Sequence, residues 1–299
     1  MRSFLKRGIL FTILATLCLY AGDFLISRRI QPASRMVYEG WYNLMRGKID
    51  ADLVVIGSSR AALHVNPAIL DSVLDIRTYN LGMIGANADL HLAKYHLFRT
   101  FNRKPSAIVH CVDVNSMQAS IPYQREQYFP WFWNRAFRET IFPIIRFSAA
   151  ERLLPLYRFY GSNSLSLMKR EPTTLYKGFK GMDPGWHDVE LGSDLFRVDA
   201  GIAASFEDYL AKATEEGISV VLVFPPLYHE KAARIQGRDE LFGFYEGLAR
   251  EHGIPFLDYS GMALCRDTAY FADKEHLNFR GADIFTDSLA RDLILLGLK

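Results

Sequence analysis

Short runs of apolar, mostly β-branched residues recur along the chain and alternate with stretches of helical pattern. The first run reads DLVVIG over residues 52–57, which is typical of a strand buried on both faces of a parallel sheet. We expect the other strands at residues 76–81, 107–114, 218–224 and 255–257, and helices at residues 88–101, 200–216 and 239–252. Parallel strands joined by helices form right-handed βαβ units. The sequence therefore predicts an α/β fold with a doubly wound, mainly parallel five-stranded sheet, in which ligands bind beyond the carboxyl ends of the strands.

The alternation of strands and helices is interrupted over about residues 116–198, where aromatic residues are frequent. A loop of this length without secondary structure would be unusual, so we expect a helical, aromatic-rich insertion that covers the ligand crevice. Its rings suit a lid, a membrane-facing surface or a partner interface, and the alternative is that they only form the insertion's own small core. The aromatic residues concerned are Phe129, Trp131, Phe132, Trp133, Phe137, Tyr157, Phe159, Tyr160 and Trp186.

The N-terminal region contains an apolar run over residues 8–26, GILFTILATLCLYAGDFLI, with basic residues on both sides. At about 1.5 Å per residue it can just cross a bilayer core of roughly 30 Å as one helix. A cleavage site of the A-x-A type is poorly matched, because Leu19 and Tyr20 precede Ala21. We expect residues 1–30 to be an uncleaved single-span anchor in the lipid bilayer, with a cleaved signal peptide and a buried core helix as alternatives. Basic residues flank both ends of the run, so its sidedness stays open.

Composition bounds the rest of the chain. Residues 31–50 mix proline and glycine with aromatic and charged residues, and we expect them to be a neck before an α/β domain over residues 51–299. The 35 Lys and Arg against 33 Asp and Glu give a net charge of +2, which does not provide the field of a general nucleic-acid-binding protein. The three cysteines, Cys18, Cys111 and Cys265, have no CxxC spacing, although the last two could pair. We therefore expect no metal, no cofactor and no nucleic-acid partner.

Two serines follow the first expected strand directly, in the sequence Gly57-Ser58-Ser59-Arg60. A chain that turns from a strand into a helix at this point exposes a hydroxyl where a nucleophile can act. The alternative is that Ser58 or Ser59 only caps the helix that follows. A phosphate-binding P-loop is disfavoured, because no Gly-Lys-Ser/Thr follows the turn.

The C-terminal region supplies two further groups needed for acyl chemistry. It reads DKEHLNFRG from Asp273, with His276 three residues later, and an amphipathic run follows over residues 282–298. A serine hydroxyl needs an imidazole to take its proton and a carboxylate to fix the tautomer of the imidazole. Ser59, His276 and Asp273 are therefore a candidate triad. The alternative is a solvated Asp-His pair in front of a helix.

The segments after the second and third expected strands read NLGMIGAN over residues 80–87 and VHCVDVN over residues 109–115. The N–H of Gly85 and the side-chain amide of Asn115, together with the N–H of Ser59, could bind a developing oxyanion. One such donor is worth roughly 3 to 4 kcal/mol. The alternatives are a turn glycine with positive φ and an asparagine that ends a strand.

These four blocks, in this order, resemble the SGNH (GDSL-like) hydrolase superfamily. The resemblance covers about residues 51–115 and 218–299, and its most specific pieces are VVIGSSR and DKEHLNFRGA. It implies a flavodoxin-like SGNH fold and a serine hydrolase or acyltransferase. The site residues that it implies are Ser59 as nucleophile, His276 and Asp273 as its activating pair, and Gly85 and Asn115 as oxyanion donors.

The chain departs from the pattern of this superfamily at two positions. Gly57-Ser58-Ser59 stands where the family usually has Gly-Asp-Ser, and Asp113 stands where it has a glycine two residues before Asn115. The second change places a carboxylate near the expected oxyanion hole, where it would disfavour further negative charge.

The anchor, the Gly-Ser-Ser turn, the insertion and the Pro225-Pro226-Leu227 segment resemble the membrane-anchored extracytoplasmic branch of the superfamily. That branch includes the D-alanyl transfer protein of teichoic acid synthesis and relatives of the alginate O-acetylation proteins. The resemblance implies an esterase or O-acyltransferase that acts on acyl esters of a cell-envelope glycan or lipid through an acyl-serine. It also implies a single-pass protein of the cell membrane with a periplasmic or outer-face catalytic domain, and a membrane-bound O-acyltransferase as a partner.

Weaker candidates and other functions complete the expectations. Arg60 could bind an acidic substrate group or pair with a carboxylate of the protein, and His229 could contact substrate at the rim of the crevice. The α/β-hydrolase fold is disfavoured, because its elbow requires glycine where Ala61 stands. The alternative function is a non-catalytic assembly partner of a membrane-bound O-acyltransferase, followed by a secreted esterase. The acyl group, the acceptor and the choice between transfer and hydrolysis do not follow from these residues, because all share one oxyanion chemistry.

Overall fold

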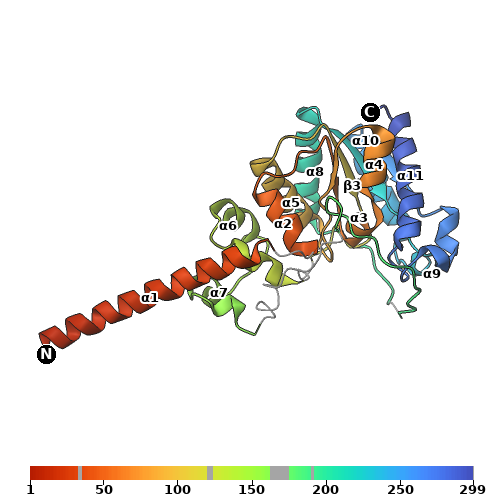
Figure 1. Ribbon diagram of the computed structural model, residues 1–299. Helices are drawn as coiled ribbons and strands as arrows, with labels where there is room; N and C mark the ends of the chain where they lie inside the picture. Colours follow the sequence, from red (N-terminus) through yellow and green to blue (C-terminus); the bar gives the residue numbers. More distant parts are fainter. Residues whose placement is uncertain (33–35, 120–123, 162–174, 190–191, 299) are drawn as a thin grey trace. The chain divides into compact units, whose positions relative to one another are not determined.

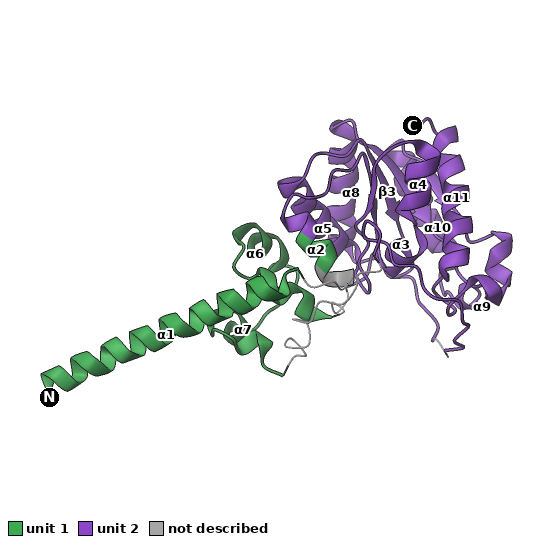
Figure 2. Cartoon of the chain, in the orientation of Figure 1, with its two compact units in different colours: residues 1–42, 124–173 green, residues 43–123, 174–299 purple. Residues whose placement is uncertain are grey.

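The computed structural model describes the chain except for residues 33–35, 120–123, 162–174, 190–191 and 299. The chain forms two compact units, shown in different colours in Figure 2. Unit 1 comprises Met1–Tyr42 and Gln124–Thr173, and unit 2 comprises Asn43–Tyr123 and Thr174–Lys299. The expected insertion is therefore divided, because its middle part belongs with the N-terminal segment and its two ends belong with the sheet.

Unit 2 contains a five-stranded sheet in which every neighbouring pair is parallel, with the order β2-β1-β3-β4-β5. This is the order of doubly wound, flavodoxin-like folds, and it confirms the predicted fold class. Each strand lies within one residue of its predicted range. The strands are β1 (Leu53–Ile56), β2 (Thr78–Asn80), β3 (Ala107–Cys111), β4 (Ser219–Phe224) and β5 (Phe256–Asp258).

Helices connect these strands (Figure 1), and those predicted from periodicity occur within one residue of their expected ends. The α-helices of unit 2 are α3 (Ser59–His64), α4 (Pro67–Leu74), α5 (Ala88–Phe101), α8 (Ala200–Glu215), α9 (His229–Ala232), α10 (Arg238–Glu251) and α11 (Phe279–Leu295). Two 3-10 helices, η4 (Ala263–Arg266) and η5 (Thr268–Tyr270), precede α11.

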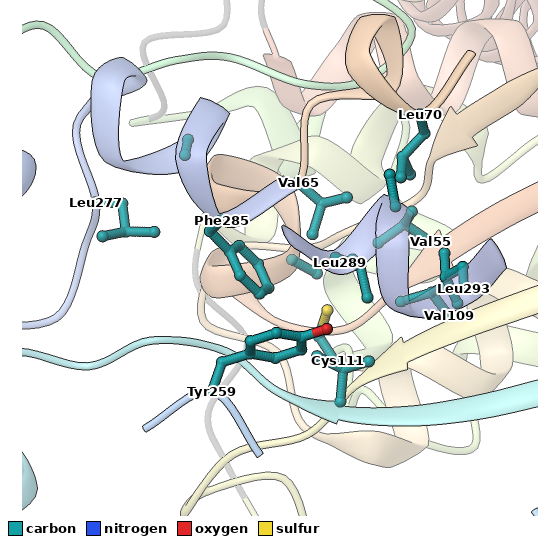
Figure 3. Close-up of a cluster of buried hydrophobic side chains, with 14 of the residues drawn as sticks. Val55, Val65, Leu70, Val109, Cys111, Tyr259, Leu277, Phe285, Leu289 and Leu293 are labelled. Carbon is teal, nitrogen blue, oxygen red and sulfur yellow. The ribbon is translucent and has the colours of Figure 1, made fainter. Parts of the chain in front are cut away.

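Helices cover both faces of the sheet. On one face, α3 and α4 pack against α11, and the core there includes Val55 and Val109 with Phe285 of α11 (Figure 3). Side chains alternate along a strand, so His110 points to the other face, where its ring contacts Phe206 of α8 at 4.9 Å. Because both faces are buried, the strands read as continuous apolar runs rather than as alternating ones.

Unit 1 is helical and has an aromatic core of its own. Its elements are α1 (Arg2–Ile30), η1 (Arg125–Trp131), α6 (Arg135–Ile141), α7 (Ala149–Leu153) and η2 (Tyr157–Phe159), and α2 (Met36–Met45) starts in it. The rings of Phe132, Phe142 and Phe147 lie within 4.7–5.1 Å of one another. Part of the aromatic content of the insertion therefore forms a local core, whereas Trp133 and Tyr160 are exposed.

The N-terminal helix α1 has 29 residues and is long and apolar enough to cross a bilayer, judged by length and composition. Figure 1 shows it extending well beyond α6 and α7 of the same unit. Its apolar side chains between Phe4 and Leu19 are mostly exposed, while Asp23, Ser27 and Ile30 are buried. Only the C-terminal part of α1 thus takes part in the packing of unit 1.

We predict that unit 2 loses stability in acid through two buried histidines. His91 of α5 and His110 of β3 have ring centroids 5.7 Å apart. Burial lowers the pKa of His91 to about 4 and that of His110 well below its ordinary value. The unfolded chain therefore binds more protons than the folded chain does at acidic pH. The free energy of unfolding is unaffected by these histidines above pH 6.5. It falls as the pH drops toward 4, by about 1.4 kcal/mol per pH unit for each histidine.

Urea unfolding of the full-length chain in detergent at pH 7.5 and at pH 5 checks this prediction. The double variant His91→Leu/His110→Phe should lose less stability between the two pH values than the wild type does. The exposed substitution His229→Gln is the matched control and should leave the pH dependence unchanged. An equal loss of stability in the wild type and the double variant would show that His91 and His110 do not cause the pH dependence.

Candidate active site

The residues that follow β1, β2 and β3 line one cavity of about 320 Å³ in unit 2. In a doubly wound fold, this carboxyl edge of the sheet is where ligands bind. Residues near α9 and in the loop before α11 complete the wall. The lining residues are Ser58, Ser59, Arg60, Gly85, Ala86, Asn87, Asp113, Val114, Asn115, Asp194, Leu227, Lys231, Glu275 and His276.

The turn between β1 and α3 depends on Gly57. Its φ of +144° is one that L side chains rarely adopt. A Cβ at this position would lie 2.5 Å from the carbonyl oxygen of Cys111 and 2.9 Å from the Cβ of Ala61. Ser58 follows in an extended conformation, and its carbonyl oxygen accepts a hydrogen bond from the N–H of Ala61. Helix α3 therefore begins at Ser59, directly beyond the end of β1.

Ser59, His276 and Asp273 form a continuous chain of hydrogen bonds. Ser59 Oγ lies 2.9 Å from His276 Nε2, and His276 Nδ1 lies 3.0 Å and 3.1 Å from the two carboxylate oxygens of Asp273. Asp273 also accepts the N–H groups of Glu275 and His276 at 2.7 and 2.8 Å.

The charges around Ser59, His276 and Asp273 determine the direction of proton transfer. Burial raises the pKa of Asp273, but the hydrogen bond and charge of His276 and the two backbone N–H groups lower it further, so the pKa lies below its ordinary value. The ionised carboxylate holds the His276 proton on Nδ1, which leaves Nε2 to accept the proton of Ser59.

The loop that carries His276 is held by two residues that the sequence analysis did not select. His64 at the end of α3 accepts the N–H of Leu277 through Nε2 at 3.0 Å. Burial, helped by the nearby charges of His276 and Arg60, lowers the pKa of His64 well below its ordinary value, so its ring is neutral and can accept. Asn278 caps α11. Its place before an amphipathic run is a cap signal, whereas no sequence pattern connects His64 with Leu277.

Asp113 is surrounded by hydrogen-bond donors. Its Oδ2 accepts the hydroxyl of Ser58, and its Oδ1 accepts the N–H of Asn115 at 2.9 Å and the hydroxyl of Ser116 at 3.1 Å. Arg60 Nη2 lies 4.0 Å from the same carboxylate. The side chain of Ser58 therefore binds Asp113, although the residue occupies the N-cap position of α3. The negative charge that the sequence placed near the oxyanion hole is thus compensated locally.

The two expected oxyanion donors, Gly85 and Asn115, both line the cavity. Gly85 has a φ of +64°, as a turn glycine requires. The side-chain oxygen of Asn115 accepts a hydrogen bond from Gln118 at 3.2 Å, which leaves its NH₂ group as a donor. Among the described residues, the N–H groups of Ser59 and Gly85 and this NH₂ group have no acceptor. Their role as oxyanion donors stays a prediction.

The weaker candidates occupy different environments. Arg60 lines the cavity but is buried, donates to the carbonyl oxygen of Pro225 at 3.3 Å and lies 4.6 Å from the ring centre of Phe224. Arg60 also lies beside the carboxylate of Asp113. Its partners therefore belong to the protein, as in the alternative that the sequence left open. His229 begins α9 and is exposed, and its ring is tilted by 52° against that of Tyr228. It is not among the described residues that line the cavity.

Lys231 is a cavity residue that sequence reasoning missed. Its side chain is buried, and its Nζ lies 2.9 Å from Asp194 and 3.0 Å from Glu275. Burial lowers the pKa of Lys231, but the two carboxylates raise it more, so the amine stays charged and connects three segments around the cavity. No group of three or more His, Cys, Asp or Glu in the described part of the chain is placed to hold a metal ion.

Comparison with known proteins gives similar structures only. No family model and no curated protein matches the sequence. The chain is similar to a GDSL-like lipase from Bacteroides thetaiotaomicron, with 14% identity, a TM-score of 0.45, and coverage of 88% of this chain and 100% of the lipase. It is also similar to a protein described as lipolytic and of the G-D-S-L family from Desulfitobacterium hafniense, with 13% identity, a TM-score of 0.42, and coverage of 81% and 99%. This degree of likeness assigns neither a family nor an activity to the chain.

We predict that Gly57→Ala lowers the free energy of unfolding by roughly 2 to 4 kcal/mol, because the new Cβ must displace the backbone of Cys111. The control is Gly247→Ala in α10, where an added Cβ meets nothing within 4 Å. That change should be neutral or stabilising by up to about 1 kcal/mol. Urea unfolding of both variants measures the difference, and equal stabilities would show that the turn does not require glycine.

We further predict that His64→Leu slows the reaction of Ser59 with a fluorophosphonate about tenfold, because the buried N–H of Leu277 loses its acceptor and the His276 loop shifts. His64→Gln, which offers a carbonyl acceptor, should restore part of the rate. Circular dichroism checks that both variants fold. An unchanged rate in folded His64→Leu would refute a positioning role for His64.

Proposed function

We propose that the chain is a membrane-anchored serine esterase or O-acyltransferase of the SGNH type that works through an acyl-Ser59 intermediate. The observation that carries this proposal is the hydrogen-bonded chain from Ser59 through His276 to Asp273 at the carboxyl edge of the sheet. The order of the four sequence blocks and the strand order of the sheet support the same superfamily.

In the first half-reaction, His276 Nε2 takes the proton of Ser59 Oγ while that oxygen attacks the carbonyl carbon of an acyl ester. Asp273 stabilises the imidazolium that forms. We assign the N–H groups of Ser59 and Gly85 and the amide of Asn115 to the oxyanion of the tetrahedral intermediate. When the ester C–O bond breaks, His276 gives its proton to the departing alkoxide, and the acyl group stays on Ser59.

In the second half-reaction, water or an acceptor hydroxyl gives its proton to His276 Nε2 and attacks the carbonyl carbon of acyl-Ser59. Collapse of this intermediate breaks the bond to Ser59 Oγ, which regains its proton from His276. Water completes hydrolysis, whereas a sugar or lipid hydroxyl completes acyl transfer. The same residues serve both outcomes.

The cavity favours a small acyl group on a polar substrate. A volume of about 320 Å³ is near the lower end for ligand pockets. Most of the side chains that line it carry a polar or charged group, and Ala86, Val114 and Leu227 are apolar. We assign the substrates to acyl esters of cell-envelope glycans or lipids, which is the class that the resemblance of the sequence implies. In this proposal, residues 8–26 hold the chain in the cell membrane with unit 2 on the extracytoplasmic side, and a membrane-bound O-acyltransferase supplies the acyl group.

Labelling with a fluorescent fluorophosphonate tests the proposal on the full-length chain in detergent. Wild type should be labelled, and Ser59→Ala and His276→Ala should not. The control is Ser205→Ala, an exposed serine of α8 whose hydroxyl donates to the carbonyl oxygen of Gly201. Hydrolysis of p-nitrophenyl acetate should fall by about 10³-fold or more in both active-site variants and stay unchanged in the control.

Full ester hydrolysis by Ser59→Ala would overturn the acyl-serine mechanism. Absence of labelling in a folded wild-type chain would overturn it as well, and would favour the non-catalytic assembly role.

A further inference from the structure

Asp23 is the one carboxylate in the apolar run of α1, and it is fully buried within unit 1. It forms an ion pair with Arg158 and accepts hydrogen bonds from Trp133 Nε1 and from the N–H of Leu156, each at 2.7 Å. Arg158 also donates to Ser27 Oγ at 3.1 Å. These contacts fix the C-terminal part of α1 to the helical segment that follows η1.

The N-terminal part of α1 carries apolar side chains that no other described residue covers. Phe4 and Phe11 are 80% and 73% exposed. If α1 crosses the membrane through residues 8–26, as the proposed function holds, Tyr20 and Asp23 lie near the C-terminal end of the span. The rings of Tyr20 and Phe24 pack edge-on against Trp133 at 6.1 and 5.7 Å. Tyr and Trp are the residues enriched at the membrane–water interface.

A cavity of about 600 Å³ lies at this level of α1, entirely within unit 1. Tyr20 and Asp23 of α1 form one side of its wall. Most of the rest is apolar and includes Phe142, Leu153 and Leu154, of which the two leucines are exposed. The cavity is therefore continuous with the part of α1 that would contact lipid chains.

Two arginines give the cavity an uncompensated positive charge. Arg138 and Arg152 line it and are exposed, and neither forms an ion pair with a described residue. The other charges of the wall are balanced, because Asp23 is paired as described above and Glu139 pairs with Arg135 at 2.7 Å. Arg138 donates one hydrogen bond to the carbonyl oxygen of Phe132 at 2.7 Å through Nη1, and its other N–H groups have no acceptor among the described residues. An apolar cavity with two guanidinium groups that lack a carboxylate partner matches an anion that carries a hydrocarbon chain.

The geometry points to a binding site for an anionic phospholipid in this cavity of unit 1. Its phosphate contacts Arg138 and Arg152, and one acyl chain lies along the apolar side of α1 beyond Tyr20. A phospholipid is favoured over a protein partner, because one wall of the cavity is the proposed membrane helix itself and the bilayer supplies this ligand at that depth. The site rests on the membrane anchoring in the proposed function but not on the chemistry of Ser59.

Native mass spectrometry of the full-length chain tests the site. The chain is released from vesicles that contain equal amounts of phosphatidylglycerol and phosphatidylcholine, and the lipid retained is counted. Wild type should retain more phosphatidylglycerol than phosphatidylcholine. Arg138→Gln/Arg152→Gln should lose about tenfold or more of this preference, since each basic residue contributes about fivefold to binding at an anionic surface. The control Arg250→Gln/Arg266→Gln removes the same charge from exposed positions of unit 2 and should behave as wild type.

Fluorescence quenching locates the lipid. Phosphatidylglycerol with brominated acyl chains should quench wild type more than Trp133→Phe, and the Arg138→Gln/Arg152→Gln variant should lose this difference. If that variant does not fold, Arg152→Gln alone serves, because no described residue accepts a hydrogen bond from Arg152.

Equal retention of both lipids by wild type, or retention by the double variant equal to wild type, would overturn the site. Co-release of a protein in place of lipid would overturn it in favour of a protein partner. Fluorophosphonate labelling of the double variant separates the two hypotheses, since loss of the lipid leaves Ser59 reactive, and loss of Ser59 reactivity leaves lipid retention intact.

Discussion

Gly57 has no room for a side chain, because the carbonyl oxygen of Cys111 occupies the space where a Cβ would be. This close approach brings the end of β1 against the end of β3, and the site is built on it. β1 and β3 are parallel neighbours, so the residues after both strands emerge at the same edge. Ser58 can then reach Asp113, and Ser59 begins α3 within hydrogen-bond distance of His276. A larger residue at position 57 would push β1 away from β3. It would therefore separate Ser58 from Asp113 and Ser59 from His276 at the same time.

Charge compensation is the second condition of the site. Buried charges are tolerated when each has an opposite charge and hydrogen bonds. Asp113 has Arg60 and three donors around it, and Lys231 has a carboxylate on either side. This explains how a carboxylate can stand where the resembling family has glycine. Its lone pairs are occupied by the protein, so its repulsion of an oxyanion is reduced.

The same rule shapes unit 1. A carboxylate inside an apolar helix would be costly in a bilayer, and Asp23 avoids that cost by pairing with Arg158 from the middle of the chain. The N-terminal helix and the centre of the insertion therefore fold as one unit. The sequence predicts an anchor, a neck and a domain that follow one another along the chain. In the structure, the N-terminal helix packs with the middle of the insertion, to which this ion pair joins it.

The three helices expected from periodicity could be predicted to within a residue, and all five strands occur where they were expected, because burial on both faces and helical periodicity are encoded in adjacent residues. The expected strand bounds are less exact, since β3 ends at Cys111 rather than at residue 114 and β2 begins at Thr78 rather than at residue 76. The grouping of Ser59, His276 and Asp273 was also accessible, since parallel strands bring their carboxyl ends to one edge and the resemblance supplied the partners. The sequence by itself thus determined the α/β class, the apolar N-terminal helix and the reactive residue types. Only the tertiary structure decided that Leu277 binds His64, 213 positions away, and that Asp23 pairs with Arg158, 135 positions away. Such contacts depend on how distant segments pack, and no local period or spacing encodes them.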